Sequence, residues 1–200
     1  LPAYSGKRIW IHASSVGETG AACAIIDEIM KDLPDADITL STVTATGYDA
    51  AVRLVPEKVK KIMAPIDFEP AVKRTLDFIM PDVLVLTETE LWPNMIMAAH
   101  ERNIKVITVN GRISDSSFRI YSRLKPFTKQ ILSVFSAFSM ISGADAGRLN
   151  NLGADPSKVF INGNSKYDQA LRISRSADEI KKAGMLADIL DARGRTVITA

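Results

Sequence analysis

Short apolar runs alternate with longer amphipathic stretches along the chain. Most of the short runs are continuously apolar, a pattern typical of parallel strands that are covered on both faces. We therefore predict strands at residues 8–13, 37–43, 59–65, 82–88, 105–111, 138–143 and 158–163.

The stretches between these strands carry apolar residues at helical spacing. Residues 21–33 place their apolar side chains on one face, and residues 69–80 do the same until Pro81 ends the pattern. Repeated strand–helix–strand units predict an α/β fold, an open parallel sheet with right-handed crossovers and helices on both faces. Further helices are expected at residues 46–55, 91–102, 116–135, 144–152 and 176–191.

Composition narrows the class of protein. The 200 residues are 46% apolar and 24% charged, which is ordinary for a globular protein with a proper core. A net charge of +2 and the absence of a basic arm do not indicate a nucleic-acid partner. Cys23 has no second cysteine to pair with, so we expect a buried structural thiol in a reducing compartment.

Candidate chemistry gathers where the predicted strands end. In an open parallel sheet, ligands bind outside the carboxyl ends of the strands. The residues expected there are rich in hydroxyl, amide and glycine positions and carry separated acids: Ser15, Gly17, Glu18, Asp67, Glu88, Glu90, Asn110, Arg112 and Lys166. Glycine lets a ligand approach the backbone closely.

Glu18 stands at the start of the first helix, the place where a nucleotide-binding turn would hold phosphate. Its charge would repel phosphate, and SVGETG lacks the G-x-G-x-x-G spacing, which also argues against a Rossmann oxidoreductase. Two interpretations stay open. Glu18 is a general base or acceptor toward a sugar hydroxyl, or it complements the helix dipole, worth about 0.3–1 kcal/mol.

Other polar positions carry weaker signals. Glu88 ends a buried strand and needs a partner, for which Arg112 or Lys166 is available. His12 is predicted to be a core imidazole, and no spacing of ligand residues resembles a metal site.

The most basic amphipathic stretch is residues 112–135, in which Arg119 and Arg123 share a helix face. It is either a surface helix packed on the sheet or a lip that faces anionic lipid or a phosphorylated acceptor.

Six motifs occur in an order that resembles a known family: HASSVGE, STVTATGYDAA, PIDF, ETELWPN, VNGRISDSSFRIY and GNSKYD. From about residue 7 to 170 the chain resembles the N-terminal half of the 3-deoxy-D-manno-octulosonic acid (Kdo) transferases of lipopolysaccharide biosynthesis. The resemblance implies one half of a GT-B fold, in which two Rossmann-like domains face a cleft. It assigns residues 1–170 to an acceptor-binding domain and residues 171–200 to a connector helix and the start of a donor-binding domain.

The resemblance also implies a reaction. Kdo is transferred from CMP-Kdo to a lipid A precursor with inversion, without a catalytic metal or other cofactor. The general base falls on Glu18 and a second essential glutamate on Glu88. By position and charge, we expect donor contact from Lys166 and acceptor contacts from Ser15, Gly17, Glu90, Asn110, Arg112, Arg119 and Arg123.

Family members carry a membrane anchor before the first strand, and the chain begins abruptly at Leu1. We therefore expect a piece of a longer protein that works at the cytoplasmic face of the bacterial inner membrane, in peripheral contact with its surface. Without the donor half, the piece is expected to be inactive. The alternatives are a GT-B enzyme with another nucleotide sugar and a soluble acceptor, and a non-catalytic sugar-binding module.

Overall fold

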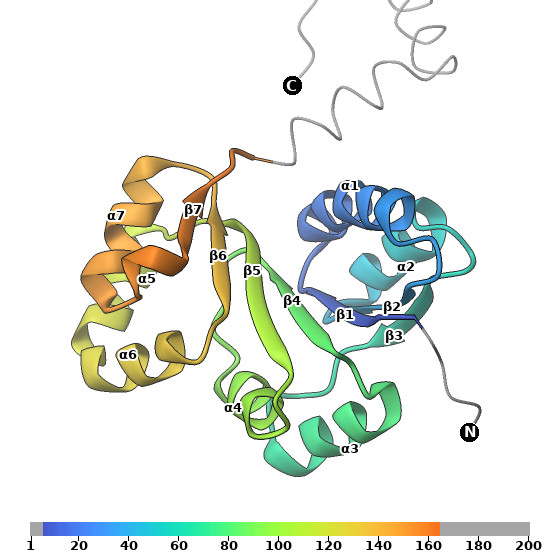
Figure 1. Cartoon of the computed structure of the whole chain (residues 1–200), viewed down its shortest axis with the longest axis horizontal. Helices are drawn as coiled ribbons and strands as arrows, with labels where there is room; N and C mark the ends of the chain where they lie inside the picture. Colours follow the sequence, from blue (N-terminus) through green and yellow to red (C-terminus); the bar gives the residue numbers. More distant parts are fainter. Residues whose placement is uncertain (1–5, 165–200) are drawn as a thin grey trace, which may run out of the picture.

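A seven-stranded parallel sheet of order β3-β2-β1-β4-β5-β6-β7 organises the computed structural model, which describes residues 6–164 (Figure 1). Its strands are β1 (Arg8–Ala13), β2 (Asp37–Thr42), β3 (Lys60–Met63), β4 (Val83–Thr87), β5 (Lys105–Gly111), β6 (Ala137–Met140) and β7 (Val159–Ile161). The helices are α1 (Val16–Asp32), α2 (Ala45–Leu54), α3 (Glu69–Ile79), α4 (Pro93–Glu101), α5 (Asp115–Arg123), α6 (Lys125–Ser133), α7 (Gly143–Leu152) and the short 3-10 helix η1 (Pro156–Lys158).

Helices cover both faces of the sheet. On one face, α1 and α2 bury residues such as Ile26 and Ala51 against β1 and β2. On the other, α3, α4, α6 and α7 enclose a larger core around Trp10 and Leu84, so that α1 and α2 lie across the sheet from α3 and α4 (Figure 1). The chain runs outward from β1 to β3 and then in the opposite direction from β4 to β7. Right-handed crossovers therefore place the two sets of helices on opposite faces, which confirms the predicted fold class.

Two helices differ from the prediction. The first helix begins at Val16 rather than residue 21, because the hydroxyl of Ser15 caps it before the apolar period starts. The stretch 116–135 is two helices, α5 and α6, which meet at Leu124. Pro126 lies in the first turn of α6 and has no N–H to continue the helix before it.

Several smaller predictions are confirmed, and others lie outside the described residues. Cys23 and His12 are buried, as predicted. The other histidine, His100 on α4, is exposed. No helix within residues 6–164 combines the length and apolar character needed to cross a membrane. Lys166 and the segment 171–200, with its predicted helix at 176–191, fall outside the part of the chain that the structure describes.

The strand order creates a crevice at one edge of the sheet. β1 and β4 are neighbours, yet α1 leaves β1 on one face and α4 follows β4 on the other. Such a switch point opens a space outside the carboxyl ends of the two strands. Glu18 follows β1 and Glu88 follows β4, so the fold brings the two predicted catalytic glutamates to this crevice.

Candidate functional site

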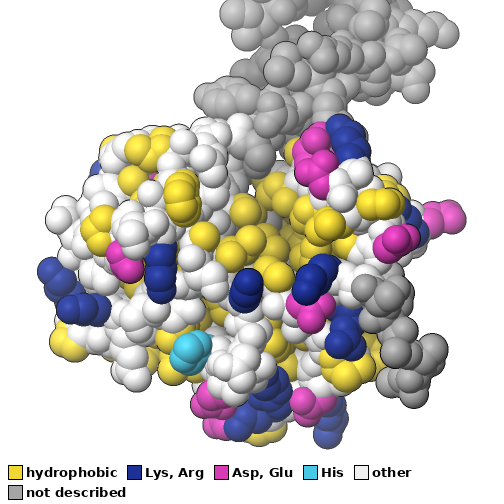
Figure 2. All heavy atoms as spheres, in the orientation of Figure 1, with side chains coloured by type: hydrophobic (Ala, Val, Ile, Leu, Met, Phe, Trp, Pro, Cys, Tyr) yellow, Lys and Arg dark blue, Asp and Glu magenta, His cyan; other side chains and the backbone are white. Residues whose placement is uncertain are grey.

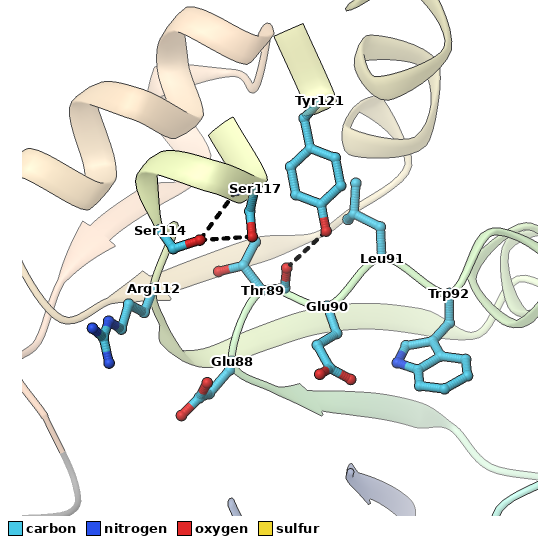
Figure 3. A pocket seen from close by; sticks show the side chains of 9 residues that line it. All are labelled: Glu88, Thr89, Glu90, Leu91, Trp92, Arg112, Ser114, Ser117 and Tyr121. Carbon is cyan, nitrogen blue, oxygen red and sulfur yellow. Dashed lines mark hydrogen bonds between the residues drawn. The ribbon is translucent and has the colours of Figure 1, made fainter. Parts of the chain in front are cut away.

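A cavity of about 650 Å³ opens at the carboxyl ends of β4 and β5 (Figure 3). The loop of residues 88–92, between β4 and α4, forms one wall, and residues 112–121 form the other. The lining combines two carboxylates, a guanidinium group, hydroxyls and two aromatic rings: Glu88, Thr89, Glu90, Leu91, Trp92, Arg112, Ser114, Ser117 and Tyr121. This set can bind a polyhydroxylated ligand that carries an anionic group.

The backbone at this edge is strained at Glu88. Its φ of 63° lies in the left-handed region, as does that of Asn110, at 54°, the last residue but one of the neighbouring strand β5. Asparagine tolerates this conformation, whereas glutamate rarely adopts it. The N–H of Glu88 donates to the carbonyl oxygen of Val109 at 2.9 Å, which holds the turn in place. Strain of this kind is found where a side chain must be aimed for function.

α7 holds the loop that carries Arg112. The N–H of Ile113 donates to Asp145 at 2.8 Å, and the guanidinium group of Arg148 donates to the carbonyl oxygen of Ile113 at 2.5 Å. Gly111 precedes Arg112 at a point where a β-carbon would lie 2.5 Å from the sulfur of Met140, so a larger residue would require the buried Met140 side chain to move. These contacts leave Arg112 exposed on the cavity wall.

Glu18 is buried beside the cavity and does not line it. Its Oε2 accepts from the N–H of Ser14 at 2.7 Å and lies 3.1 Å from the hydroxyl of Thr87. Its Oε1 accepts from the hydroxyl of Ser15 at 3.1 Å. Because Ser15 also caps α1, the pair forms a variant of the capping box. These hydrogen bonds are those expected if Glu18 stabilises the start of α1.

The surroundings of Glu18 also suit an acid–base group. Burial raises the pKa of its carboxyl, and the charges of Glu90 and Glu88 raise it further, against the lowering effects of the hydrogen bonds from Ser14 and Ser15. The net direction is upward, toward the range in which a general base works near neutral pH. Capping and proton transfer are therefore compatible roles for this residue.

Ser14 links the two loops of the crevice. Its N–H donates to Glu18, while its hydroxyl donates to Glu90. Glu90 is exposed on the cavity wall, so this bridge couples the buried carboxylate to the open one. The β1–α1 turn and the β4–α4 loop are joined at the switch point.

A buried histidine packs under the same loop. Trp10 donates its indole N–H to the hydroxyl of Ser41 at 2.8 Å, and the same hydroxyl forms a hydrogen bond with Nδ1 of His12, 2.9 Å away. The ring of His12 meets the half-buried indole of Trp92 edge-on, with centroids 5.1 Å apart. Burial lowers the pKa of His12 from 6.5 to about 4.

This shift predicts a pH dependence of stability. Folding favours neutral His12, so its contribution is fully present above about pH 6.5 and is lost as the pH falls toward 4. The loss amounts to about 3 kcal/mol in the free energy of unfolding. Urea unfolding at a series of pH values measures this loss. The difference in free energy of unfolding between the wild type and His12→Gln should shrink from pH 7 to pH 4. The matched exposed variant, His100→Gln, should show no such trend; a constant difference for His12→Gln would contradict the prediction.

The structure brings part of the predicted site together. Glu88, Glu90 and Arg112 line the cavity, and Ser15, Gly17 and Glu18 lie in the adjoining first turn of α1 or at its cap. Asn110 is buried at the end of β5. Arg119 and Arg123 are exposed on α5 and are not among the lining residues.

Several lining residues were not predicted. Thr89 lies between the two predicted glutamates, and Ser114, Ser117 and Tyr121 project from α5 and its cap (Figure 3). The spacing of the last three is that of one helix face, a signal that is visible in the sequence once α5 is known to border the cavity. Within residues 6–164, no group of three potential ligand side chains is placed to hold a metal ion, and the metal-free reaction stays a prediction.

Comparisons with known proteins place this geometry in a family. The sequence profile of the 3-deoxy-D-manno-octulosonic-acid transferase (kdotransferase) family matches residues 2–169. The chain is 39% identical over 165 residues to a bifunctional glycosyltransferase/methyltransferase of Fusobacterium nucleatum, covering 82% of this chain and 26% of that protein. It is 33% identical over 160 residues to a 3-deoxy-D-manno-octulosonic acid transferase of Haemophilus influenzae, covering 80% and 38%.

Solved structures agree on the architecture. The UDP-GlcNAc 2-epimerase of Neisseria meningitidis, bound to UDP-GlcNAc, superposes with a TM-score of 0.64 at 13% identity, over 87% of this chain and 52% of that one. This likeness shows the fold, one Rossmann-like half of a GT-B architecture. The chain spans about a quarter to two fifths of the length of these two curated relatives. By its motifs, its sheet and this profile match, the chain belongs to the Kdo transferase family, within its N-terminal domain.

Proposed function

We propose that the full-length protein transfers Kdo from CMP-Kdo to a lipid A precursor with inversion, and that this chain is its acceptor-binding half. The observation that carries the proposal is the meeting of Glu18, Glu88 and Glu90 at the switch point, beside a cavity lined by Arg112. Membership of the Kdo transferase family supports the donor sugar. The relatives are longer than this chain, which supports a donor half beyond it.

Glu18 has the role of the base. A hydroxyl oxygen of the acceptor attacks the anomeric carbon of Kdo, its proton passes to Glu18, and the bond to the phosphate of CMP breaks, so that CMP leaves with the bonding electrons. Oε2 of Glu18 is held by Ser14 and lies near Thr87, whereas Ser15 is the one donor to Oε1 among the described residues. A substrate hydroxyl that approaches the exposed Ser15 would therefore meet Oε1. Gly17, also exposed in this turn, leaves room for the sugar.

The cavity has the role of the acceptor site. Glu88 and Glu90 accept hydrogen bonds from sugar hydroxyls, and Arg112 pairs with a phosphate of the acceptor. Tyr121 and Trp92 offer rings against which a sugar can pack. Lys166, which lies outside the described residues, remains our candidate for the donor side, and we propose no metal or other cofactor.

α5 and α6 have the role of a membrane-facing lip. Ile120, Leu124 and Phe127 are each more than half exposed. Arg119 directly precedes Ile120, and Arg123 directly precedes Leu124. Figure 2 shows basic and hydrophobic side chains side by side on the part of the surface that these helices form. Such a surface suits peripheral contact with anionic lipid at the cytoplasmic face of the inner membrane.

We expect Arg119→Ala/Arg123→Ala to weaken binding of the protein to vesicles rich in anionic lipid by about 30-fold, since each of the two basic residues contributes about 1 kcal/mol near such a surface. Sedimentation with vesicles at low and high salt measures it, and neutral vesicles are the control. Lys7, a basic residue in front of β1, provides the matched variant Lys7→Ala. If the affinity for vesicles, or for the acceptor, changes neither with the mutations nor with the salt concentration, the proposed role of this surface is wrong.

An assay of the full-length protein tests the function. With CMP-Kdo and a lipid A precursor, we expect release of CMP and a product lipid heavier by Kdo. Residues 1–200 alone are expected to give no product. Turnover only with another nucleotide sugar and a soluble acceptor, or sugar binding without turnover, would replace the proposal with one of the two alternatives.

A further inference from the structure

The first turn of α4 is capped from a different part of the chain. Trp92 occupies the N-cap position and makes no side-chain capping bond. Instead, Asp67, in the loop between β3 and α3, accepts from the N–H of Met95 at 2.9 Å and from that of Asn94 at 3.2 Å. These N–H groups belong to the set that has no partner within a helix. One carboxylate therefore satisfies two of them from another element.

The contact is reciprocal. The side-chain amide of Asn94 donates to the carbonyl oxygen of Asp67 at 2.6 Å. Two hydrogen bonds thus join Asp67 of the PIDF motif to Asn94 of the ETELWPN motif, 27 residues further along the chain, and a third reaches Met95, which directly follows that motif. Met95 is fully buried, so the cap ties the start of α4 to the core as well as to the β3–α3 loop.

This cap adjoins the wall of the cavity. The loop of residues 88–92 carries Glu88 and Glu90, and α4 begins immediately after it. The hydrogen bond from Glu88 to Val109 anchors one end of the loop. The Asp67 cap anchors the other. A five-residue loop that is fixed at both ends holds its side chains in one place, and a displacement of about 1 Å can cost 10²-fold in rate.

We propose that Asp67 is a positioning residue, which holds the loop of residues 88–92 so that Glu88 and Glu90 meet the substrate. Without its carboxylate, the N–H groups of Asn94 and Met95 lose their acceptor, and the first turn of α4 opens more often. The loop then loses the anchor at the end where it enters α4. The catalytic part of this statement rests on the proposed function, whereas the anchoring part stands on the hydrogen bonds alone.

Hydrogen exchange tests the anchoring in the full-length protein without substrate. In Asp67→Ala, amides of residues 88–96 should exchange about 5- to 10-fold faster, while those of the core strands keep their rates. Asp155→Ala is the matched control. Asp155 also caps a helix, η1, with a carboxylate that accepts from Ser157 at 3.0 Å, and it lies before β7, at the opposite edge of the sheet. Its removal should leave exchange in residues 88–96 unchanged.

The transfer assay tests the consequence for catalysis. We expect Asp67→Ala to lower kcat by at least about 10-fold, and Asp67→Asn, which keeps one oxygen for Met95, to recover to within about 3-fold of the wild type. Asp155→Ala should match the wild type. Unchanged exchange, or faster exchange with unchanged kcat and KM, would overturn the proposal. Failure of the wild-type protein to transfer Kdo would overturn the proposed function instead, because the exchange experiment needs no substrate.

Discussion

Glu18→Gln is expected to lower the turnover of the full-length enzyme by at least about 10²-fold, which is the contribution of a positioned general base. Glutamine keeps the shape and can serve in a capping box, with its oxygen accepting from Ser14 and its amide group donating to Ser15. The fold and the melting temperature should therefore stay close to the wild type. Steady-state kinetics and thermal unfolding on the same preparation separate the two roles of Glu18.

The pH profile gives a second measure of the same residue. A base must be ionised, so wild-type turnover should fall as the pH drops through the raised pKa of Glu18, and this acid limb should vanish in the Gln variant. Glu69→Gln is the matched control, because Glu69 is the acid in the first turn of α3 and pairs with Lys73. It should change turnover less than about 2-fold, as expected for a helix-dipole effect alone. Near-normal turnover of Glu18→Gln would leave only the capping role.

Glu88→Gln is expected to lower kcat/KM by about 10²-fold, the scale of a lost substrate-positioning contact. The carboxylate lines the cavity with Arg112, and the fold keeps its backbone in a left-handed conformation that glutamate rarely adopts. A rise in KM would assign Glu88 to holding the acceptor, and a fall in kcat would assign it to the transition state.

The control for Glu88 lies at the other end of the helix that follows it. Glu101 is exposed at the end of α4, and Glu101→Gln should behave as the wild type. A change of less than about 3-fold for Glu88→Gln, against the 10²-fold expected, would remove Glu88 from the catalytic site.

The local pattern of the chain was enough to predict the elements. Apolar runs flanked by helical periods placed all the strands from β1 to β7 within three residues of their observed ends. The start of α1 and the break between α5 and α6 were not predicted, because each depends on a single residue. Ser15 caps α1 ahead of its apolar face, and Pro126 divides a continuous amphipathic stretch into α5 and α6. Capping and proline effects act on one turn, below the length over which periodicity is measured.

The sequence likewise predicted some features of the site and not others. Knowing that parallel strands share a carboxyl edge was sufficient to gather Glu88, Glu90 and Arg112 in advance. It could not show that Tyr121 completes the cavity or that Ser14 bridges to Glu90, 76 residues away. Such contacts depend on how two loops approach one another in space.

By itself, then, the sequence determined the order of strands and helices, the edge at which the chemistry collects and the motifs of the family, because these follow from short-range periodicity and strand direction. Only the tertiary structure decided that Glu18 is buried with a raised pKa, that His12 is neutral and that Asp67 caps α4. Burial, protonation and capping across elements depend on neighbours that are distant in the chain, and only the folded sheet brings those neighbours together.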